Sequence, residues 1–277
     1  MHPTVLLPLL LALASFPAAS ATDWRAELRQ RIERLDRDTP GALGVYVKRL
    51  DVDEAYGHNA DQVWYLGSSA KVAIAIAVLR QVDAGRLKLD SRLTLQEGDR
   101  VDGPGELVWT KPGARYTVDS LLTRMLGVSD NTAANMLVRA VGEDPLNQVA
   151  AELLGKGFVR LTNLTQVRRE VYAQIHPEAA KLPNQALVAI AAAEMGPGRL
   201  DAVRRALDVP ASALKVRTLG EAYDRYYQTR FNSATLEGYG GSGPIVWGQG
   251  GRRIAAGEIV PGGVRIWDAP GFGTDGK

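Results

Sequence analysis

The segment Y-L-G-S-S-A-K at 65–71 contains a serine and a lysine whose spacing suits nucleophilic chemistry. A serine hydroxyl becomes a good nucleophile when a neighbouring base takes its proton, and a lysine can be that base if burial lowers its pKa. Ser68 and Lys71 are three residues apart, so on a helix their side chains share one face. Taken alone, the pair fits equally well a helix cap followed by a lysine whose ammonium reaches solvent.

Chance explains one such pair in a chain of this length, because Ser-x-x-Lys is expected about once at ordinary residue frequencies. A second match, Ser212 and Lys215, follows Pro210 in a less apolar setting, and there we expect an ordinary helix cap. The chemical interpretation of Ser68 therefore depends on other residues.

A serine, an aspartate and an asparagine at 129–131 supply those residues. A second hydroxyl and an amide beside a Ser/Lys pair are what acyl transfer to a cyclic amide requires. The alternative makes Ser129 or Asp130 the N-cap of a helix that begins near Thr132, and this does not exclude the catalytic role.

The run S-D-N-T-A-A-N and the apolar helix behind S-S-A-K resemble the class A β-lactamases and related penicillin-recognising serine hydrolases. The resemblance implies that Ser68 is acylated and that Lys71 accepts or relays its proton. It also implies that Ser129 passes a proton to the lactam nitrogen, that Asn131 binds the side-chain amide of the substrate, and that Asp130 is structural.

Over roughly residues 24–240 the resemblance also implies a fold and an activity. The fold is α/β, with an antiparallel sheet flanked by helices and an all-helical subdomain. The activity is hydrolysis of a β-lactam amide without metal or cofactor, by a protein that we expect to be monomeric. The substrate is a β-lactam or a peptidoglycan peptide.

The first departure from the family pattern concerns the glutamate that activates the deacylating water, in the pattern E-x-x-L-N. The nearest match is Glu170 in V-R-R-E-V-Y-A-Q, with Gln174 where the asparagine would stand. A glutamate flanked by arginines is more typical of a solvated ion-pair face. Without such a glutamate, an acyl-enzyme forms but does not turn over.

The second departure is that K-[TS]-G, whose lysine normally holds the substrate carboxylate, does not occur in this sequence. Two alternatives therefore stay open. One is a peptidoglycan D,D-peptidase or transpeptidase that shares Ser68, Lys71 and Ser129 but does not need Glu170. The other is a catalytically defective cell-wall binding relative. Trp109 is either a substrate-flanking aromatic or a packing anchor.

Composition excludes several classes of function. The chain has 277 residues, 45% of them hydrophobic, and a net charge of +2 without any long basic run, which favours a globular protein that does not bind nucleic acid. Cysteine is absent, so disulfides and thiolate metal sites are excluded. The three histidines show no paired spacing for a metal or a Ser-His-Asp set.

The sequence divides into three segments. Residues 1–21 are apolar and end in Ala-Ser-Ala, which predicts a secretory signal peptide, a periplasmic or secreted protein and no membrane association after cleavage. The alternative is an uncleaved anchor, because the usual positively charged n-region is missing. Residues 22–240 form the predicted serine hydrolase domain. Residues 241–277 are rich in glycine and lack a helical period, so we interpret them as a truncated or frame-shifted end. In this end the runs 245–247, 258–260 and 264–267 fit either strands or disorder.

Hydrophobic periodicity predicts the elements of the domain. We expect an amphipathic helix from Trp24 to Leu35, strands at 42–50 and 54–58, an enclosed helix from Ser68 to Ala84, and a long glycine-containing loop to Gly113. Further helices are predicted at 118–126, 132–141, 146–154, 184–195, 199–207, 219–227 and 234–239.

Overall fold

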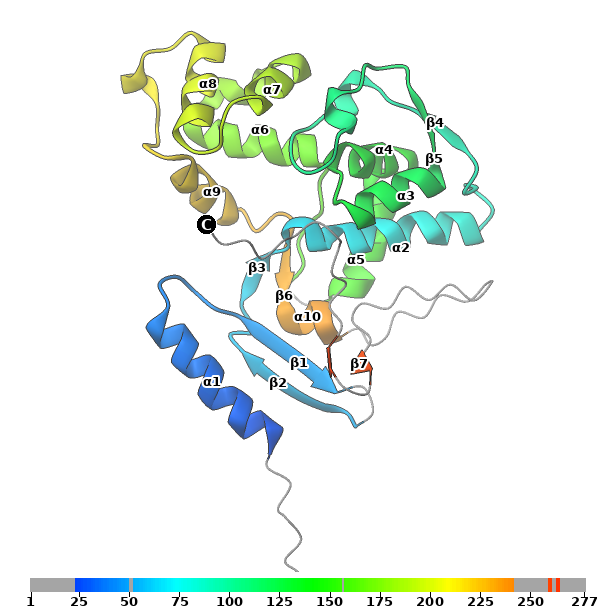
Figure 1. The fold of residues 1–277 in the computed structure, drawn as a ribbon, viewed down its shortest axis with the longest axis vertical. Coiled ribbons are helices and arrows are strands. Elements are labelled where there is room, and N and C mark those ends of the chain that lie inside the picture. The colour runs from blue at the N-terminus through cyan, green and yellow to red at the C-terminus, as the bar shows by residue number, and fades with distance from the viewer. Residues whose placement is uncertain (1–22, 50–51, 156, 242–258, 261–262, 265–277) are drawn as a thin grey trace, which may run out of the picture. The chain divides into compact units, whose positions relative to one another are not determined.

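The computed structural model describes residues 23–49, 52–155, 157–241, 259–260 and 263–264, in two units divided after Ala42. The first unit contains helix α1 (Trp24–Asp38), as the periodicity predicts. Asp23 caps this helix by accepting a hydrogen bond from the backbone N–H of Arg25, 3.1 Å away. All other elements belong to the second unit (Figure 1).

The strands of the second unit form antiparallel pairs. They are β1 (Val45–Arg49) with β2 (Glu54–His58), β3 (Val63–Tyr65) with β6 (Ser233–Thr235), β4 (Arg92–Thr94) with β5 (Arg115–Thr117), and β7 (Ile259–Val260) with β8 (Gly263–Val264). The first pair confirms both predicted strands. Within the described residues these pairs are not joined into one larger sheet.

The pair β3–β6 positions the segment that carries Ser68. Trp64 lies opposite Ala234, and beyond the ladder the backbone N–H of Leu66 donates to the carbonyl of Asn232 at 2.9 Å. The chain then enters a 3₁₀ turn, η1 (Gly67–Ser69), which continues directly into helix α2 (Ala70–Asp83). The hydrogen bond between Leu66 and Asn232, which are far apart in sequence, therefore fixes the start of this helix.

Helix α2 is enclosed, as the sequence predicts. From Ala70 to Val78 every residue except Val72 is buried, and an α-helix that is apolar on all sides belongs in a protein interior. Gly85, with φ of +70°, follows its C-terminus. Three helices pack around it in the larger core (Figure 1): α3 (Val118–Gly127), α4 (Asn131–Val141) and α5 (Glu143–Leu154).

A separate helical core forms the all-helical part of the molecule. It is built from α6 (Leu164–Ile175), α7 (Asn184–Ala191), α8 (Pro197–Leu207) and α9 (Leu219–Tyr227). Tyr172 of α6 and Tyr226 of α9 are among its fully buried side chains. Together with the antiparallel strands, this part confirms the α/β fold class.

The structure corrects three expectations about elements. Helix α6 was not predicted, although Leu164, Val167, Val171 and Ile175 have helical spacing, because the polar run around Glu170 masks it. The long loop is shortened by β4, β5 and two 3₁₀ turns, η2 (Glu97–Asp99) and η3 (Leu107–Trp109). The last helix, α10 (Leu236–Gly241), starts two residues late because 233–235 are a strand.

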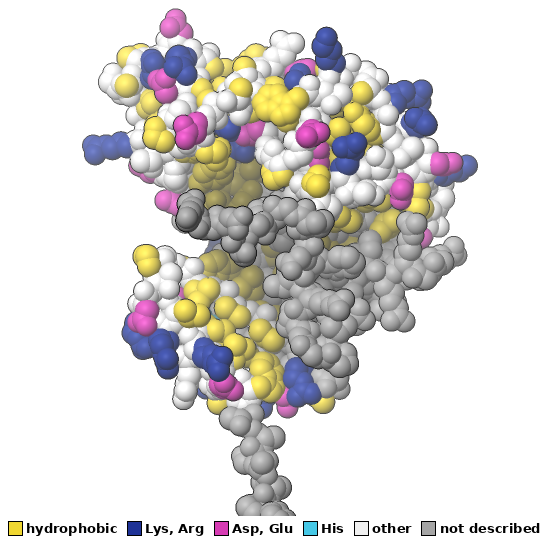
Figure 2. Space-filling view, viewed as in Figure 1, with side chains coloured by type: hydrophobic (Ala, Val, Ile, Leu, Met, Phe, Trp, Pro, Cys, Tyr) yellow, Lys and Arg dark blue, Asp and Glu magenta, His cyan; other side chains and the backbone are white. Residues whose placement is uncertain are grey.

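The terminal segments are described only in part. The predicted signal peptide at 1–21, the predicted strand at 245–247 and all but the first residue of the predicted strand at 264–267 lie outside the described residues, and the domain boundaries stay predictions. The pairing of β7 with β8 confirms strand structure at 259–260. Among the helices that the structure describes, none has the length and apolarity to span a bilayer. Basic and acidic side chains are interspersed on the face shown in Figure 2.

Candidate active site

The turn η1 separates the roles of its two serines. The hydroxyl of Ser69 donates to the carbonyl oxygen of Leu66 at 2.6 Å and so holds the turn. Ser68 is exposed, and its Oγ atom accepts from Lys71 Nζ, one turn along the helix, and from Ser129 Oγ, 61 residues away in sequence. Of the two hydroxyls in S-S-A-K, Ser68 is therefore the one available to an incoming substrate.

The ammonium group of Lys71 lies at the centre of the site. Lys71 is only 3% exposed, although it is charged in its ordinary state. Its Nζ atom donates to Ser68 Oγ (3.3 Å), Ser129 Oγ (2.8 Å), the Ser129 carbonyl (2.6 Å) and Asn131 Oδ1 (2.6 Å). The structure thus brings together four of the predicted site residues, and none of the oxygens bound to Nζ is a carboxylate.

This surrounding changes the acidity of Lys71. Burial disfavours the charged form and lowers the pKa of the Lys71 ammonium to about 8, while the negative charge of Asp130 acts in the opposite direction. A lysine with a pKa near neutral can exist as a free amine at physiological pH and act as a general base. Burial of Lys71 therefore supplies the lowered pKa that the lysine needs to act as the base for Ser68.

Ser129 brings the second hydroxyl from the connection between α3 and α4. Its Oγ atom is 2.9 Å from Ser68 Oγ, so the two hydroxyls and the amine of Lys71 are in mutual contact. The backbone of Ser129 has φ of +59°, a left-handed conformation that is unfavourable for a non-glycine residue. Such strained residues cluster at functional sites, where the surrounding structure holds them in place.

Asp130 and Asn131 begin helix α4 and have different partners. Asp130 is the N-cap: its Oδ1 accepts from Ala133 N at 2.9 Å, and its Oδ2 accepts from Leu107 N at 3.3 Å. Asn131 accepts from Lys71 through Oδ1 and donates through Nδ2 to the carbonyl of Asp102 at 2.7 Å. The cap role of Asp130 is confirmed, and Asn131 lies in the site.

A pH profile is expected to report the Lys71 amine. With a pKa of about 8, roughly one Lys71 side chain in ten is neutral at pH 7, and this fraction rises as the pH increases. We expect the second-order rate constant for acylation of Ser68 to rise with pH to a plateau, with a midpoint near pH 8. Stopped-flow measurements with a chromogenic β-lactam check this; a rate that falls over the same interval contradicts it.

Two other predicted site residues, Glu170 and Trp109, make no hydrogen bond to Ser68, Lys71 or Ser129 among the described residues. Glu170, on α6, accepts from Gln166 Nε2 at 2.9 Å through one carboxylate oxygen and lines a cavity of about 270 Å³ with Thr162 and Phe231. Within the described residues, the hydrogen bonds of Glu170 do not include Ser68, Lys71 or Ser129. Trp109, at the end of η3, is 57% exposed. The proposed roles of Glu170 and Trp109 stay predictions.

The competing features of the sequence have ordinary structural positions. Ser212 and Lys215 are exposed, in and just after a short 3₁₀ turn, η5 (Ala211–Ala213). His176 caps the turn η4 (Pro177–Lys181) through its side chain. Within the described ranges, no group of three or more His, Cys, Asp or Glu residues is arranged to hold a metal ion.

Sequence comparison assigns the chain to a family. A model of the Beta-lactamase enzyme family matches residues 27–200, which include the Ser68, Lys71 and Ser129 cluster. The chain belongs to the beta-lactamase enzyme family. This confirms the resemblance that the S-x-x-K and S-D-N motifs indicate.

Individual relatives match over part of their length. A beta-lactamase from Rhodobacter capsulatus is 28% identical over 134 residues, covering 48% of this chain and 45% of the relative. Beta-lactamase L2 from Stenotrophomonas maltophilia is 29% identical over 159 residues, covering 57% and 52%. The chain therefore spans about half the length of these curated family members.

Two solved structures match a similar share of the chain. A structure of PBP-A aligns with a TM-score of 0.48 and 30% identity, covering 51% of this chain and 54% of that one. A mutant of PBP-A solved as an acyl-enzyme complex with penicillin G aligns with a TM-score of 0.44 and 32% identity, covering 46% and 49%.

The sequence did not reveal a group of residues beside the site. Asp102 is buried and contacts Arg168 of α6 and Arg199 of α8. These three residues are separated by long stretches of chain and form no local motif, so the folded structure is needed to find them. Gly103 and Gly105 belong to the long glycine-containing loop that the sequence predicts.

Proposed function

We propose that the chain is an exported serine hydrolase of the β-lactamase type that forms an acyl-enzyme at Ser68. One observation carries the proposal: a buried Lys71 amine with a pKa of about 8 contacts both the Ser68 and the Ser129 hydroxyls. Membership of the beta-lactamase family supports a β-lactam amide as the substrate class.

The acylation step follows from the order of the contacts. The neutral amine of Lys71 takes the proton of Ser68, and the Oγ atom forms a bond to the carbonyl carbon of the lactam. The C–N bond of the ring breaks, and Ser129 gives its proton to the leaving nitrogen. Lys71 returns its proton to Ser129, which contacts its Nζ at 2.8 Å, so both side chains regain their starting states.

A second candidate function, a D,D-peptidase or transpeptidase of the cell wall, is favoured by the position of Glu170. One oxygen of its carboxylate accepts from Gln166 Nε2, and the other is buried without a hydrogen-bond partner among the described residues. Among the described residues the Glu170 carboxylate makes no hydrogen bond to Ser68, Lys71 or Ser129, as expected if it does not activate the deacylating water. If the chain is a peptidase of this kind, the acyl-enzyme forms as readily as in a lactamase, but it is hydrolysed slowly.

Intact-mass analysis of the purified protein after exposure to penicillin tests the proposal. We expect the mass to increase by that of one penicillin molecule, and a Ser68→Ala variant treated in parallel to show no increase. A wild-type protein that is neither labelled by penicillin nor able to turn over nitrocefin contradicts the proposal and favours a non-catalytic relative. Rapid loss of the adduct together with nitrocefin turnover supports a lactamase, whereas an adduct that lasts for hours supports a peptidase.

The same spectra test the proposed export. The apolar segment that ends in Ala19-Ser20-Ala21 supports cleavage before Thr22. Protein recovered from a periplasmic fraction is expected to have the mass of a chain that begins at Thr22. Recovery of the chain with Met1 from the cytoplasm contradicts the proposed location.

A further inference from the structure

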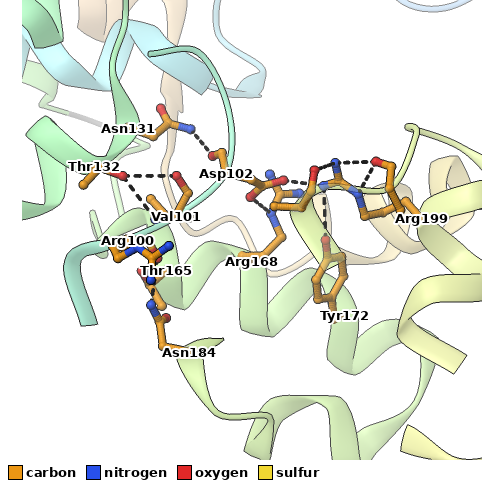
Figure 3. A network of polar contacts seen from close by, with 12 residues as sticks. Arg100, Val101, Asp102, Asn131, Thr132, Thr165, Arg168, Tyr172, Asn184 and Arg199 are labelled. Atoms are coloured by element: carbon orange, nitrogen blue, oxygen red, sulfur yellow. Dashed lines mark hydrogen bonds and ion pairs between the residues drawn. The ribbon is translucent and has the colours of Figure 1, made fainter. Parts of the chain in front are cut away.

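The side chain of Asp102 joins the active-site loop to the second helical core. Asp102 is 7% exposed, and its Oδ1 accepts from Arg168 Nε of α6 at 2.7 Å, while its Oδ2 accepts from Arg199 Nη1 of α8 (Figure 3). A buried carboxylate shared by two guanidinium groups resists displacement, because moving it leaves the buried Arg199 and the partly buried Arg168 without a counter-ion.

Both arginines are themselves fixed by other groups. Arg199 is 4% exposed and donates to the carbonyls of Ala191 and Ala193 through Nη2, at 2.9 and 3.0 Å. Arg168 donates to the hydroxyl of Tyr223, and its guanidinium lies over the ring of Tyr172 at 5.6 Å. The position of Asp102 is therefore set by the helical core.

The backbone of Asp102 determines which way the Asn131 amide faces. Its carbonyl oxygen is an acceptor and requires a donor, so Asn131 must turn Nδ2 towards it, at 2.7 Å (Figure 3). Asn131 Oδ1 is then directed to Lys71 Nζ, 2.6 Å away. A flipped amide would place a carbonyl oxygen against a carbonyl oxygen and an NH₂ group against an amine.

The glycine after Asp102 allows this close approach. Gly103 has φ of +129°, and a Cβ atom at this position would overlap the amide group of Asn131. The loop thus packs its bare backbone directly on the Asn131 side chain. Any displacement of Asp102 is transmitted to the amide over a single hydrogen bond.

We propose that Asp102, held by Arg168 and Arg199, is a positioning residue that orients the Asn131 amide and through it the Lys71 side chain for attack by Ser68. The inference deepens the proposed function and rests on it for its catalytic meaning. The coupling of Asp102 to Lys71 through Asn131 does not depend on that function and can be tested separately.

A double-mutant cycle with Asp102→Asn and Asn131→Ala tests the coupling through acylation rates. We expect Asp102→Asn to slow acylation by penicillin about tenfold in the wild-type background and less than about twofold in the Asn131→Ala background. Equal factors in the two backgrounds would overturn the proposal, because a purely structural or long-range charge effect does not depend on Asn131.

A second readout does not need catalysis. The pKa of Lys71 is measured by NMR in protein labelled with ¹³C at lysine Cε, with Lys71→Arg used for assignment. Loss of the Asn131 acceptor removes a hydrogen bond to the ammonium, so Asp102→Asn should lower this pKa more in the wild-type background than in the Asn131→Ala background. Equal shifts overturn the proposal. If wild-type protein is not acylated, the proposed function fails while this titration still decides the coupling.

Two further variants keep the experiment interpretable. Asp201, on α8, forms ion pairs with Arg204 (2.8 Å) and Arg205 (2.6 Å) at the protein surface. Asp201→Asn weakens these pairs and should leave both readouts unchanged. If Asp102→Asn does not fold, Arg199→Gln enters the same cycle, because it leaves the Asp102 carboxylate paired with Arg168. Additive effects of Arg199→Gln and Asn131→Ala then overturn the proposal.

Discussion

Replacing Lys71 by methionine is expected to slow acylation of Ser68 by a factor of about 10²–10⁴. Methionine has a similar length and tolerates burial, but it cannot accept the proton of the Ser68 hydroxyl. The rise of the rate with pH around 8 should disappear with it, since that rise reflects the pKa of the Lys71 amine. Single-turnover kinetics with a chromogenic β-lactam, followed from pH 6 to 10, give both results.

The chain provides its own control for this experiment. Lys215 belongs to the other Ser-x-x-Lys match and is exposed, so Lys215→Met should acylate at the wild-type rate. Circular dichroism of both variants reports whether each is folded. A folded Lys71→Met protein that acylates at the wild-type rate would contradict the role of Lys71 and with it the proposed mechanism.

Alanine at position 105 is expected to destabilise the protein through Asp130. Gly105 has φ of +92°, and an added Cβ atom would overlap the Asp130 side chain, which caps α4 and accepts from Leu107 N. We expect backbone strain to cost about 1–3 kcal/mol of the free energy of unfolding, and the overlap a further 1–3 kcal/mol or so. Urea denaturation measures the sum.

Gly113 separates the two contributions. It has φ of +100°, but a Cβ atom there would meet nothing within 4 Å. Gly113→Ala therefore carries strain of a similar kind without the overlap. The difference between the two variants is the effect of contact with Asp130, and equal destabilisation would show that the contact is unimportant. Acylation should be slower in Gly105→Ala and unchanged in Gly113→Ala, because Asp130 lies between Ser129 and Asn131 and its displacement moves both.

The parts of the site that sequence reasoning predicted are those with a local pattern. Ser68 and Lys71 meet because they share one helical face, and the apolar run behind them predicts a buried helix with a buried lysine. The motif at 129–131 was associated with this pair through the family resemblance, and the structure places Ser129 Oγ 2.9 Å from Ser68 Oγ. Periodicity likewise predicted most helices around this site.

The remaining features depend on tertiary contacts. Asp102, Arg168 and Arg199 come from a loop and two helices, and their charges are indistinguishable in sequence from the many surface ion pairs of this chain. The short strands β4 and β5 have only three residues each, too few for an alternating pattern to stand out. The partner of Glu170 could not be predicted because the helix that places it beside Gln166 was itself missed.

The four contacts of Lys71 have a consequence for the moment at which its nitrogen loses a proton. A neutral amine keeps two hydrogens and one lone pair. The Ser129 carbonyl and Asn131 Oδ1 cannot donate, so they retain the two hydrogens, at 2.6 Å each. The lone pair is left facing the two hydroxyls, so the base is aimed at them without any movement of heavy atoms.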